Sequence, residues 1–179
     1  PVEIGEPEII EHRVNPRATD TGYLTAGTTG SLSPISYHNG PLIQTPTAYV
    51  IWYGNWNQTN GTDTPAGQQI VRDFLSSVGG SNYYKVNTTY SAGGYNVSGN
   101  VTRATAEATP GYSYGKRLSD ANIQSIVKDA INSGALPADA NGVYFVLTSS
   151  DVSESSGFCS RYCGWHTSTS STQTSNGRL

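Results

Sequence analysis

The stretch TAYVIWYG, residues 47–54, is apolar or aromatic at almost every position and shows no alternation between apolar and polar side chains. A strand with one solvated face alternates, so this pattern predicts a strand buried on both faces. The run GVYFVLTSS, residues 142–150, is also apolar, β-branched and aromatic, and it predicts another strand. Two such apolar strands with helices between them in sequence indicate a sheet that is covered by helices.

Two further segments predict amphipathic helices with clear start and stop signals. Thr64 is placed to cap the first helix, with Pro65 at its first position and Gly79-Gly80 at its end. Ser119 is placed to cap the second helix, and Gly134 to stop it. The positions expected to face the core are Ile70, Val71, Phe74, Leu75 and Val78 in the first helix and Ile123, Ile126, Val127, Ala130 and Ile131 in the second.

The order of these elements predicts an α/β fold, a mixed β-sheet with two main amphipathic helices packed on it. Residues 82–90 and 95–108 are expected to add strands, with a turn at Gly93-Gly94. A right-handed crossover would place the two apolar strands together in the centre of the sheet.

An extended N-terminal arm and linker, residues 1–34, is expected to precede a single globular α/β domain, residues 35–179, which ends in a polar C-terminal tail. The arm contains Pro1, Pro7, Pro16 and Pro34, shows no helical period, and ends in a run rich in Gly, Thr and Ser. Its strand-capable pieces carry the apolar residues Ile4, Ile9, Ile10 and Val14. Such an arm can add as a strand to an open sheet edge of a neighbouring subunit, which predicts self-association into a fibre. The alternative is a processed terminus with no such role.

The composition argues against several classes of partner. Charged residues make up 13% of the chain, the net charge is −3, and Lys and Arg do not cluster, so no nucleic-acid partner is expected. The longest strongly apolar run, residues 48–53, is far too short to span a bilayer. Glycosylation sequons occur at Asn57, Asn60, Asn87, Asn96 and Asn100. Their crowding predicts a surface that carries N-glycans, the alternative being an ordinary loop region rich in Asn and Thr.

The segment SGFCSRYCGWHTS, residues 156–168, contains both cysteines of the chain and one of its histidines. Cys159, Cys163 and His166 supply three of the donors that a tetrahedral metal site needs, but with unusual spacing and without a second cysteine pair. Arg161 and His166 are placed to activate a thiol nucleophile. A local disulfide would require the residues between the cysteines to curl into a turn. Two buried reduced thiols complete the set of alternatives.

No other catalytic signature occurs, so we predict no catalytic residue and no cofactor. The chain lacks HExxH, G-x-S-x-G and P-loop motifs. Asp151 directly follows the second apolar strand, where it either belongs to an active site or caps the next loop. Trp52 is expected in the core, whereas Trp56 is a candidate for stacking on carbohydrate. Glu107 is expected to be solvated.

The order of five sequence blocks resembles the Exordium-like, or phosphate-induced, protein family over about residues 37–166. The blocks are YHNGPL (37–42), VIWYG (50–54), DFLSS (73–77), VLTSSDV (146–152) and GFCSRYCGWH (157–166). The resemblance implies a secreted protein of the cell wall or extracellular matrix without established catalytic activity. The Cys/His segment is similar to a hallmark of that family, and we predict that it is a turn closed by a Cys159–Cys163 disulfide in an oxidising compartment. Members of that family usually continue well past this block with further cysteines, which offers either cysteine another partner in a longer chain.

We therefore expect an extracellular, glycosylated, non-enzymatic structural or surface protein that self-associates through its arm and contacts matrix polysaccharide. One alternative is a secreted enzyme, hydrolytic or metal-dependent, that uses His166, the two cysteines and Asp151. Another is a carbohydrate-binding module that uses exposed aromatic residues such as Trp56. Bound zinc would favour the enzyme, and retention on polysaccharide would favour the binding module.

Overall fold

The structure is a computed structural model, and it describes residues 10–13, 42–92, 94–158 and 160–167.

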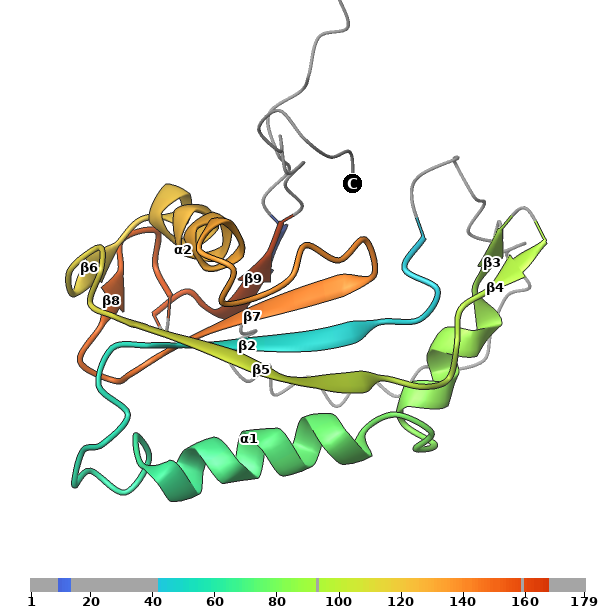
Figure 1. Cartoon of the computed structure of the whole chain (residues 1–179), viewed down its shortest axis with the longest axis horizontal. Coiled ribbons are helices and arrows are strands. Elements are labelled where there is room, and N and C mark those ends of the chain that lie inside the picture. Colours follow the sequence, from blue (N-terminus) through green and yellow to red (C-terminus); the bar gives the residue numbers. More distant parts are fainter. Residues whose placement is uncertain (1–9, 14–41, 93, 159, 168–179) are drawn as a thin grey trace, which may run out of the picture.

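The centre of the fold is a parallel three-stranded sheet (Figure 1). Strand β2 (Thr47–Tyr53) lies between β5 (Thr102–Gly111) and β7 (Gly142–Thr148), and it pairs in parallel with both. The predicted strands at residues 47–54 and 142–150 are confirmed as neighbours in this sheet. Only β2 is central, however, because β7 lies at the edge of the three strands. Antiparallel pairs lie beside it in smaller sheets, and the α/β class is confirmed.

Two helices cover opposite faces of the sheet, α1 (Pro65–Ser77) and α2 (Asp120–Asn132) (Figure 1). Both begin as predicted. The Thr64 hydroxyl accepts a hydrogen bond from the Gly67 amide at 3.0 Å, and Ser119 forms a capping box with Asn122. These caps fix the first turn of each helix and so the direction in which it crosses the sheet.

Alternation along β2 sends its side chains into two cores. Tyr49, Ile51 and Tyr53 pack with residues of α2, whereas Val50 and Trp52 pack with residues of α1. The strand is therefore buried on both faces, as its unbroken apolar sequence predicts.

The prediction for the apolar face of α1 is wrong at two positions. Leu75 is buried, but Ile70 and Phe74 are 71% and 57% exposed. The reason is that α1 turns Arg72 and Ser76 toward β5, where their partners are Glu107 and Arg103. Ion pairing with β5 thus sets the rotation of α1 about its axis, so that Leu75 and Val71 face the sheet whereas Ile70 and Phe74 face outward.

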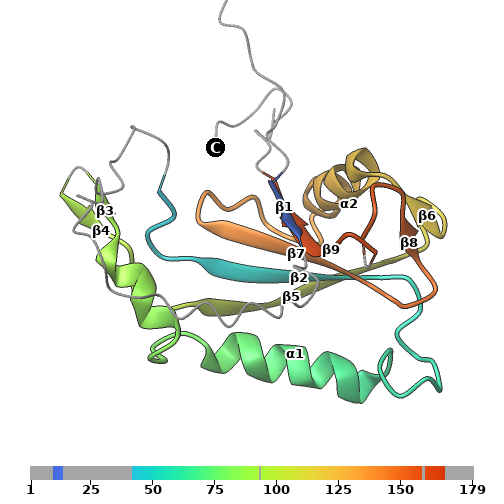
Figure 2. The same cartoon turned by 180° about the vertical axis from the view of Figure 1, so that it is seen from behind.

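A projecting unit, residues 84–96, lies at the end of the sheet where the three strands begin (Figure 1). It consists of the 3₁₀ helix η1 (Tyr84–Thr89) and the hairpin strands β3 (Ser91–Ala92) and β4 (Tyr95–Asn96). We call it the hairpin unit. Figure 2 shows the same placement from behind. The predicted turn between residues 92 and 95 is confirmed by the pairing of β3 with β4.

The predicted strand at residues 82–90 is wrong, because this segment forms η1. The side chains of Asn87, Thr88 and Thr89 each donate a hydrogen bond to the carbonyl three residues earlier. Such local bonds compete with strand pairing, and here they stabilise the helical turns. The predicted strand at residues 95–108 is present only as the separate strands β4 and β5.

Two small sheets complete the described structure. Strand β6 (Arg117–Leu118) pairs in parallel with β8 (Ser153–Glu154). Strand β1 (Ile10–Arg13) pairs antiparallel with β9 (Tyr162–His166) of the same chain. The expected strand in the arm is therefore present at Ile10. The other arm residues of the self-association prediction, Ile4, Ile9 and Val14, lie outside the described residues.

Candidate functional site

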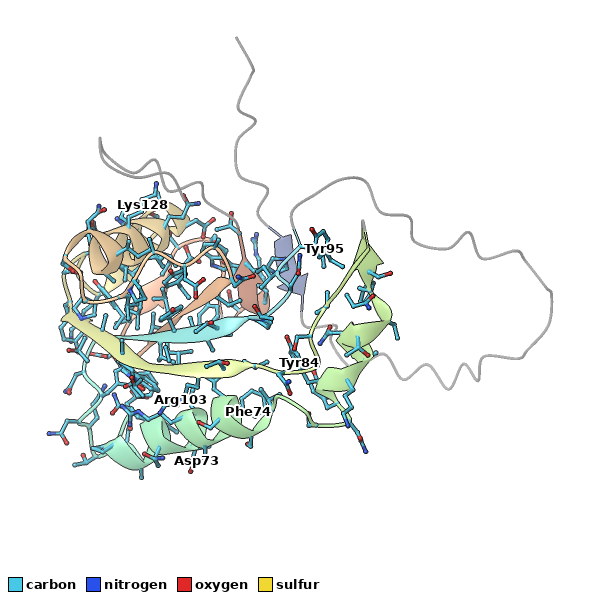
Figure 3. The ribbon with its side chains drawn as sticks, turned by 45° about the vertical axis from the view of Figure 1, so that its right-hand side comes forward. Asp73, Phe74, Tyr84, Tyr95, Arg103 and Lys128 are labelled. Atoms are coloured by element: carbon cyan, nitrogen blue, oxygen red, sulfur yellow. The ribbon has the colours of Figure 1, made fainter. Side chains whose placement is uncertain are left out.

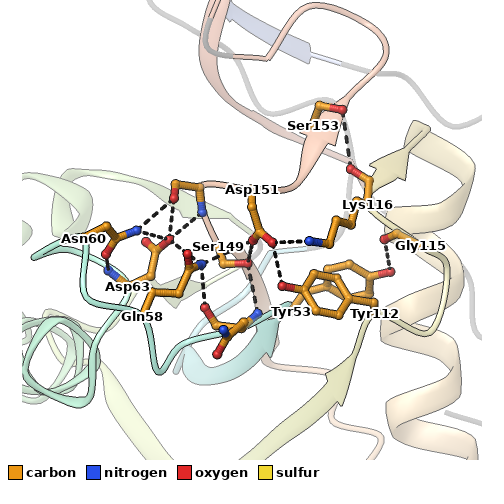
Figure 4. A network of polar contacts seen from close by, with 12 residues as sticks. Tyr53, Gln58, Asn60, Asp63, Tyr112, Gly115, Lys116, Ser149, Asp151 and Ser153 are labelled. Carbon is orange, nitrogen blue, oxygen red and sulfur yellow. Dashed lines mark hydrogen bonds and ion pairs between the residues drawn. The ribbon is translucent and has the colours of Figure 1, made fainter.

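Polar side chains gather at the edge of the sheet where the three parallel strands end. Parallel strands bring their carboxyl ends together, and the loops that follow them are the usual location of binding and catalytic groups. Here the loops after β2, β5 and β7 are joined by a network of hydrogen bonds (Figure 4). We call it the carboxyl-edge network.

Asp63 is one centre of this network and is only 5% exposed. Its carboxylate accepts hydrogen bonds from the Ser150 amide at 2.7 Å, the Ser150 hydroxyl at 2.6 Å and the Asn60 amide at 2.8 Å. Burial raises the pKa of Asp63, but these bonds and one from Thr62 outweigh it and hold that pKa below its usual range. The ionised carboxylate thereby ties the loop after β2 to the loop after β7.

Asp151 is the second centre. It accepts hydrogen bonds from the Ser149 hydroxyl at 2.6 Å and the Tyr112 hydroxyl at 2.7 Å, and it pairs with the Lys116 ammonium at 2.7 Å. Lys116 is the main cause that holds the pKa of Asp151 well below its usual range, followed by Ser149 and Tyr112. Asp151 in turn raises the pKa values of Lys116 and Tyr112. The ammonium also lies 4.9 Å from the centre of the Tyr112 ring.

Gln58 connects the two centres. Its side-chain amide donates to Asp63 at 3.1 Å and to Asp151 at 3.3 Å. Asp151 is therefore a member of the carboxyl-edge network. The hydrogen bonds that its carboxylate accepts in this network come from Ser149, Tyr112, Lys116 and Gln58, and not from the loop that follows Asp151.

The arrangement around Ser149 is suited to holding loops rather than to nucleophilic attack. A serine nucleophile needs a base and access to substrate. Ser149 has a carboxylate partner in Asp151, but it is only 1% exposed, and its oxygen also accepts a hydrogen bond from the Asn55 amide. Throughout the described part of the chain, no buried side-chain nitrogen or oxygen lacks a hydrogen-bond partner.

A second polar cluster lies on the α1 side of the sheet around Glu107. Its carboxylate accepts hydrogen bonds from Trp52 at 2.8 Å, from two nitrogens of Arg72 and from Arg103. The Arg72 guanidinium is the main cause that lowers the pKa of Glu107. The expectation of a solvated Glu107 is therefore wrong, because an indole N–H and two guanidinium groups converge on this position.

The Cys/His segment contains a tight turn. The amides of Ser160 and Arg161 both donate to the Gly157 carbonyl, at 3.1 and 2.8 Å, and Phe158 forms a β-bridge with Tyr162. Tyr162 is buried, and its hydroxyl donates to Glu154 at 2.8 Å and contacts the Ser156 hydroxyl. This contact set anchors the turn on the loop that follows β8.

The predicted cysteine pair itself is not placed by the structure. Cys159 lies outside the described residues, and the structure gives only the backbone of Cys163, in β9. The backbone of His166 pairs with Ile10. The partners of Asp151 are Ser149, Tyr112, Lys116 and Gln58, so the carboxylate assigned to the enzyme alternative belongs to a different group of side chains. Within the described ranges, no three His, Cys, Asp or Glu side chains form a group suited to a metal ion.

Trp52 and Trp56 form a packed pair in which the rings meet edge to face at 4.7 Å. Trp52 is buried, as predicted. Trp56 is half-buried against it, and its indole N–H donates to the Tyr53 carbonyl at 3.2 Å. Trp56 is thus held in the α1-side core, and its ring is only partly available for stacking on sugar.

The five sequon asparagines differ in how the structure uses them. Asn57, Asn60, Asn96 and Asn100 are exposed. Both amide hydrogens of Asn60 are used, in bonds to Asp63 at 2.8 Å and Ser150 at 3.0 Å. The half-buried Asn87 donates to the Tyr84 carbonyl at 3.0 Å.

Asp63, Tyr112 and Lys116 were not expected in a site from the sequence. The sequence signal for this place is Asp151, directly after an apolar strand. The other three residues come from loops far away from it in sequence, and pairing between loops is visible only when the strand order is known.

The fold and its carboxyl-edge network define a class, an α/β protein with a parallel sheet covered by one helix on each face. Comparison with known proteins gives the family. The family model described as the phosphate-induced protein 1 conserved region matches residues 35–178. The chain belongs to this phosphate-induced, or Exordium-like, family.

Two Arabidopsis thaliana proteins are similar to this chain over most of its length. Protein EXORDIUM-like 5 is 30% identical over 179 residues, which cover 93% of this chain and 47% of that protein. Protein EXORDIUM-like 3 is 31% identical over 149 residues, which cover 76% of this chain and 42% of that protein. The chain thus spans less than half the length of these relatives. No solved structure matches it.

Proposed function

We propose that this chain is an extracellular, N-glycosylated and non-catalytic surface protein of the cell wall or matrix. Its membership of the Exordium-like family supports this role. No helix in the described part of the chain is long and apolar enough to cross a membrane.

The observation that carries the proposal is the exposure of Asn57, Asn96 and Asn100. An N-linked sugar replaces one amide hydrogen of its asparagine and needs room at the surface. Each of these three side chains has an amide group and lies at the surface, where a sugar has room. At Asn60 the sugar would replace a hydrogen bond to Asp63 or Ser150, so we expect this sequon to stay unoccupied in the folded protein.

The non-catalytic role is supported by the chemistry of the carboxyl-edge network. Its carboxylates are held ionised by internal hydrogen bonds, and its serine next to a carboxylate is buried. Groups that are fully engaged with each other stabilise loops, whereas catalysis needs groups presented to a substrate.

The predicted Cys159–Cys163 disulfide belongs to the same proposal. The bridge between Phe158 and Tyr162 joins the residues that directly precede the two cysteines. A turn of this kind is what a disulfide across three residues requires. The bond marks an oxidising compartment, as expected for a secreted protein.

Mass spectrometry of the protein secreted by a eukaryotic host tests this proposal. A peptide map without reduction should show sugar at Asn57, Asn96 and Asn100, an unmodified Asn60, and a closed Cys159–Cys163 peptide. The matched control is the N60Q variant, which should keep every glycan, whereas N57Q should lose one. An intact mass equal to the bare polypeptide would refute the glycan prediction. Free alkylatable thiols, or a stoichiometric metal on them, would refute the disulfide.

We also propose that the chain self-associates by exchanging its arm. The observation that favours this is the antiparallel pairing of β1 with β9, in which a strand far from the domain in sequence adds to a strand near its other end. The same pairing between two chains would be head-to-tail and would produce rings or filaments.

A further inference from the structure

We propose that Tyr90 and Tyr95 form a binding surface for a neutral polysaccharide, which we call the tyrosine face. This inference rests on the proposed extracellular role and names the partner of that role. Unlike the earlier candidate Trp56, these side chains belong to the projecting hairpin unit and lie away from both cores.

The register of the hairpin places both tyrosines on one face. Tyr95 pairs directly with Ala92, and the Val97 amide donates to the Tyr90 carbonyl, which sets Tyr90 opposite Val97. Residues opposite each other, and residues two apart on one strand, lie on the same face. Tyr90 and Tyr95 are therefore diagonal neighbours, and side chains at such positions are about 7–8 Å apart.

Core packing does not explain these tyrosines. Tyr90 is 51% and Tyr95 is 61% exposed, and neither belongs to one of the two cores. Two further apolar side chains of the same region, Tyr83 and Val86, are also exposed. Figure 3 shows Tyr95 on the hairpin unit, apart from Phe74 on α1. Exposed aromatic side chains gathered on one projection are typical of an interaction surface.

The charge of this region selects the chemistry of the partner. Residues 79–101 contain one charged side chain, that of Lys85, and are otherwise rich in hydroxyl and amide groups. A surface with a single positive charge attracts an acidic polymer or an anionic membrane only weakly. Tyrosine combines a flat apolar ring with a hydroxyl, which suits sugar rings that present C–H groups on one face and hydroxyls at the rim.

The sequon in β4 leaves this face open. Asn96 pairs with Ser91, so its side chain lies on the opposite face of the hairpin from Tyr95. A glycan at Asn96 would cover one face while the tyrosine face remains accessible. The hairpin can therefore carry its own sugar and bind another.

Retention of the purified full-length protein on insoluble cellulose tests the inference, with soluble xyloglucan as a second neutral probe and polygalacturonate as an acidic one. The protein should bind the neutral probes, and binding should not change when salt is raised. The Y90A/Y95A variant should bind at least about fivefold more weakly, because it removes both rings on which the sugar would stack. Y90F/Y95F keeps the rings and should retain most of the binding.

Phe74 provides the matched control, because it is an exposed aromatic residue on a different element. F74A should bind like the unchanged protein, and so should N96Q. Equal losses in F74A and Y90A/Y95A would overturn the inference, as would binding to polygalacturonate alone. A change of oligomeric state in Y90A/Y95A without any effect on retention would assign the tyrosine face to a second copy of the chain and also overturn it.

The outcome can be separated from that of the proposed function. A protein that is secreted and glycosylated but not retained by any neutral polysaccharide contradicts the tyrosine face alone. A protein that is retained but carries no glycan when secreted contradicts the glycan prediction alone.

Discussion

At the scale of single residues, Gly54 is a position where the carboxyl-edge network lies directly against the backbone. It follows β2 with a φ of +94°, and a Cβ atom there would lie 2.1 Å from the Ser149 hydroxyl oxygen. Only glycine adopts this backbone conformation without strain and leaves space for Ser149. The position of Ser149, and through it that of Asp151, depends on this missing side chain.

We predict that G54A lowers the free energy of unfolding by about 2 to 5 kcal/mol, the sum of backbone strain and steric overlap. Gly61 is the matched control, since it has a φ of +82° but no atom within 4 Å of the position of a Cβ. G61A should therefore cost only the strain, about 1 to 2 kcal/mol. Urea denaturation of both variants measures the difference. Equal losses would show that Ser149 does not restrict this position.

At the scale of elements, the sequence predicts well those helices and strands that are determined by local patterns of residues. The strands β2 and β7 were predicted because their runs lack alternation, and α1 and α2 because their caps are explicit in Thr64 and Ser119. For the segment that forms η1 the local pattern predicts a strand, which is wrong, because aromatic and β-branched residues favour strands on average. Its asparagine and threonine side chains instead bond to nearby carbonyls, and that competition depends on geometry.

Local sequence patterns also fail to predict contacts between residues that are distant in sequence, and the two polar clusters are made of such contacts. The rotation of α1 follows from the pairing of Arg72 with Glu107, which are 35 residues apart. Ser150 and Asp63 are 87 residues apart. Periodicity alone predicts that Ile70 and Phe74 face the core, because it contains no information about such ion pairs. Asp151 indicates from the sequence that a polar site lies at the end of β7. The sequence does not indicate that Asp63, Tyr112 and Lys116 belong to the carboxyl-edge network.

The contact between α1 and β5 should make the protein sensitive to acid. The pKa of Glu107 is lowered in the folded state, chiefly by Arg72, whereas an unfolded glutamate has a pKa of about 4.3. A carboxylate of this kind stabilises the fold above its unfolded pKa, and the contribution is lost as the pH falls through the folded pKa. Asp63, Asp151 and Glu154 have lowered pKa values too and act in the same direction.

We predict that E107Q lowers the free energy of unfolding at pH 7 by about 2 kcal/mol, because it weakens charged hydrogen bonds in a half-buried cluster. The E107Q variant should also lose less stability than the unchanged protein when the pH falls below about 5. Some loss should remain, because Asp63, Asp151 and Glu154 still have lowered pKa values. D73N is the control, because the exposed Asp73 side chain on the same helix accepts a hydrogen bond from Gln69, at 2.8 Å, and takes no part in the Glu107 cluster. Denaturation curves at several pH values measure both effects. Parallel pH profiles for E107Q and the unchanged protein would contradict the assignment.

At the scale of the whole molecule, we expect the arm to pair either with its own chain or with a neighbouring chain. Strand β1 is joined to β2 by residues 14–46 and pairs with β9 near the other end of the described chain. A tethered strand competes for its partner at an effective concentration on the order of millimolar, so pairing within one chain is favoured in dilute solution. Pairing between chains forms the same backbone hydrogen bonds, and its share therefore grows with protein concentration.

Deletion of residues 1–34 should abolish concentration-dependent assembly. The full-length protein is expected to form dimers and longer chains as its concentration approaches the millimolar range, or after it is refolded at high concentration, and light scattering with electron microscopy would detect them. The point variant E11P should have the same effect as the deletion, because proline within β1 disrupts its pairing with β9, where Glu11 lies opposite Trp165. E6P, an identical exchange outside β1, should assemble like the unchanged protein. Assembly that is equal in the full-length and shortened proteins, or absent from both, would show that the arm pairs only within its own chain, as an edge cover for β9 rather than a link between subunits.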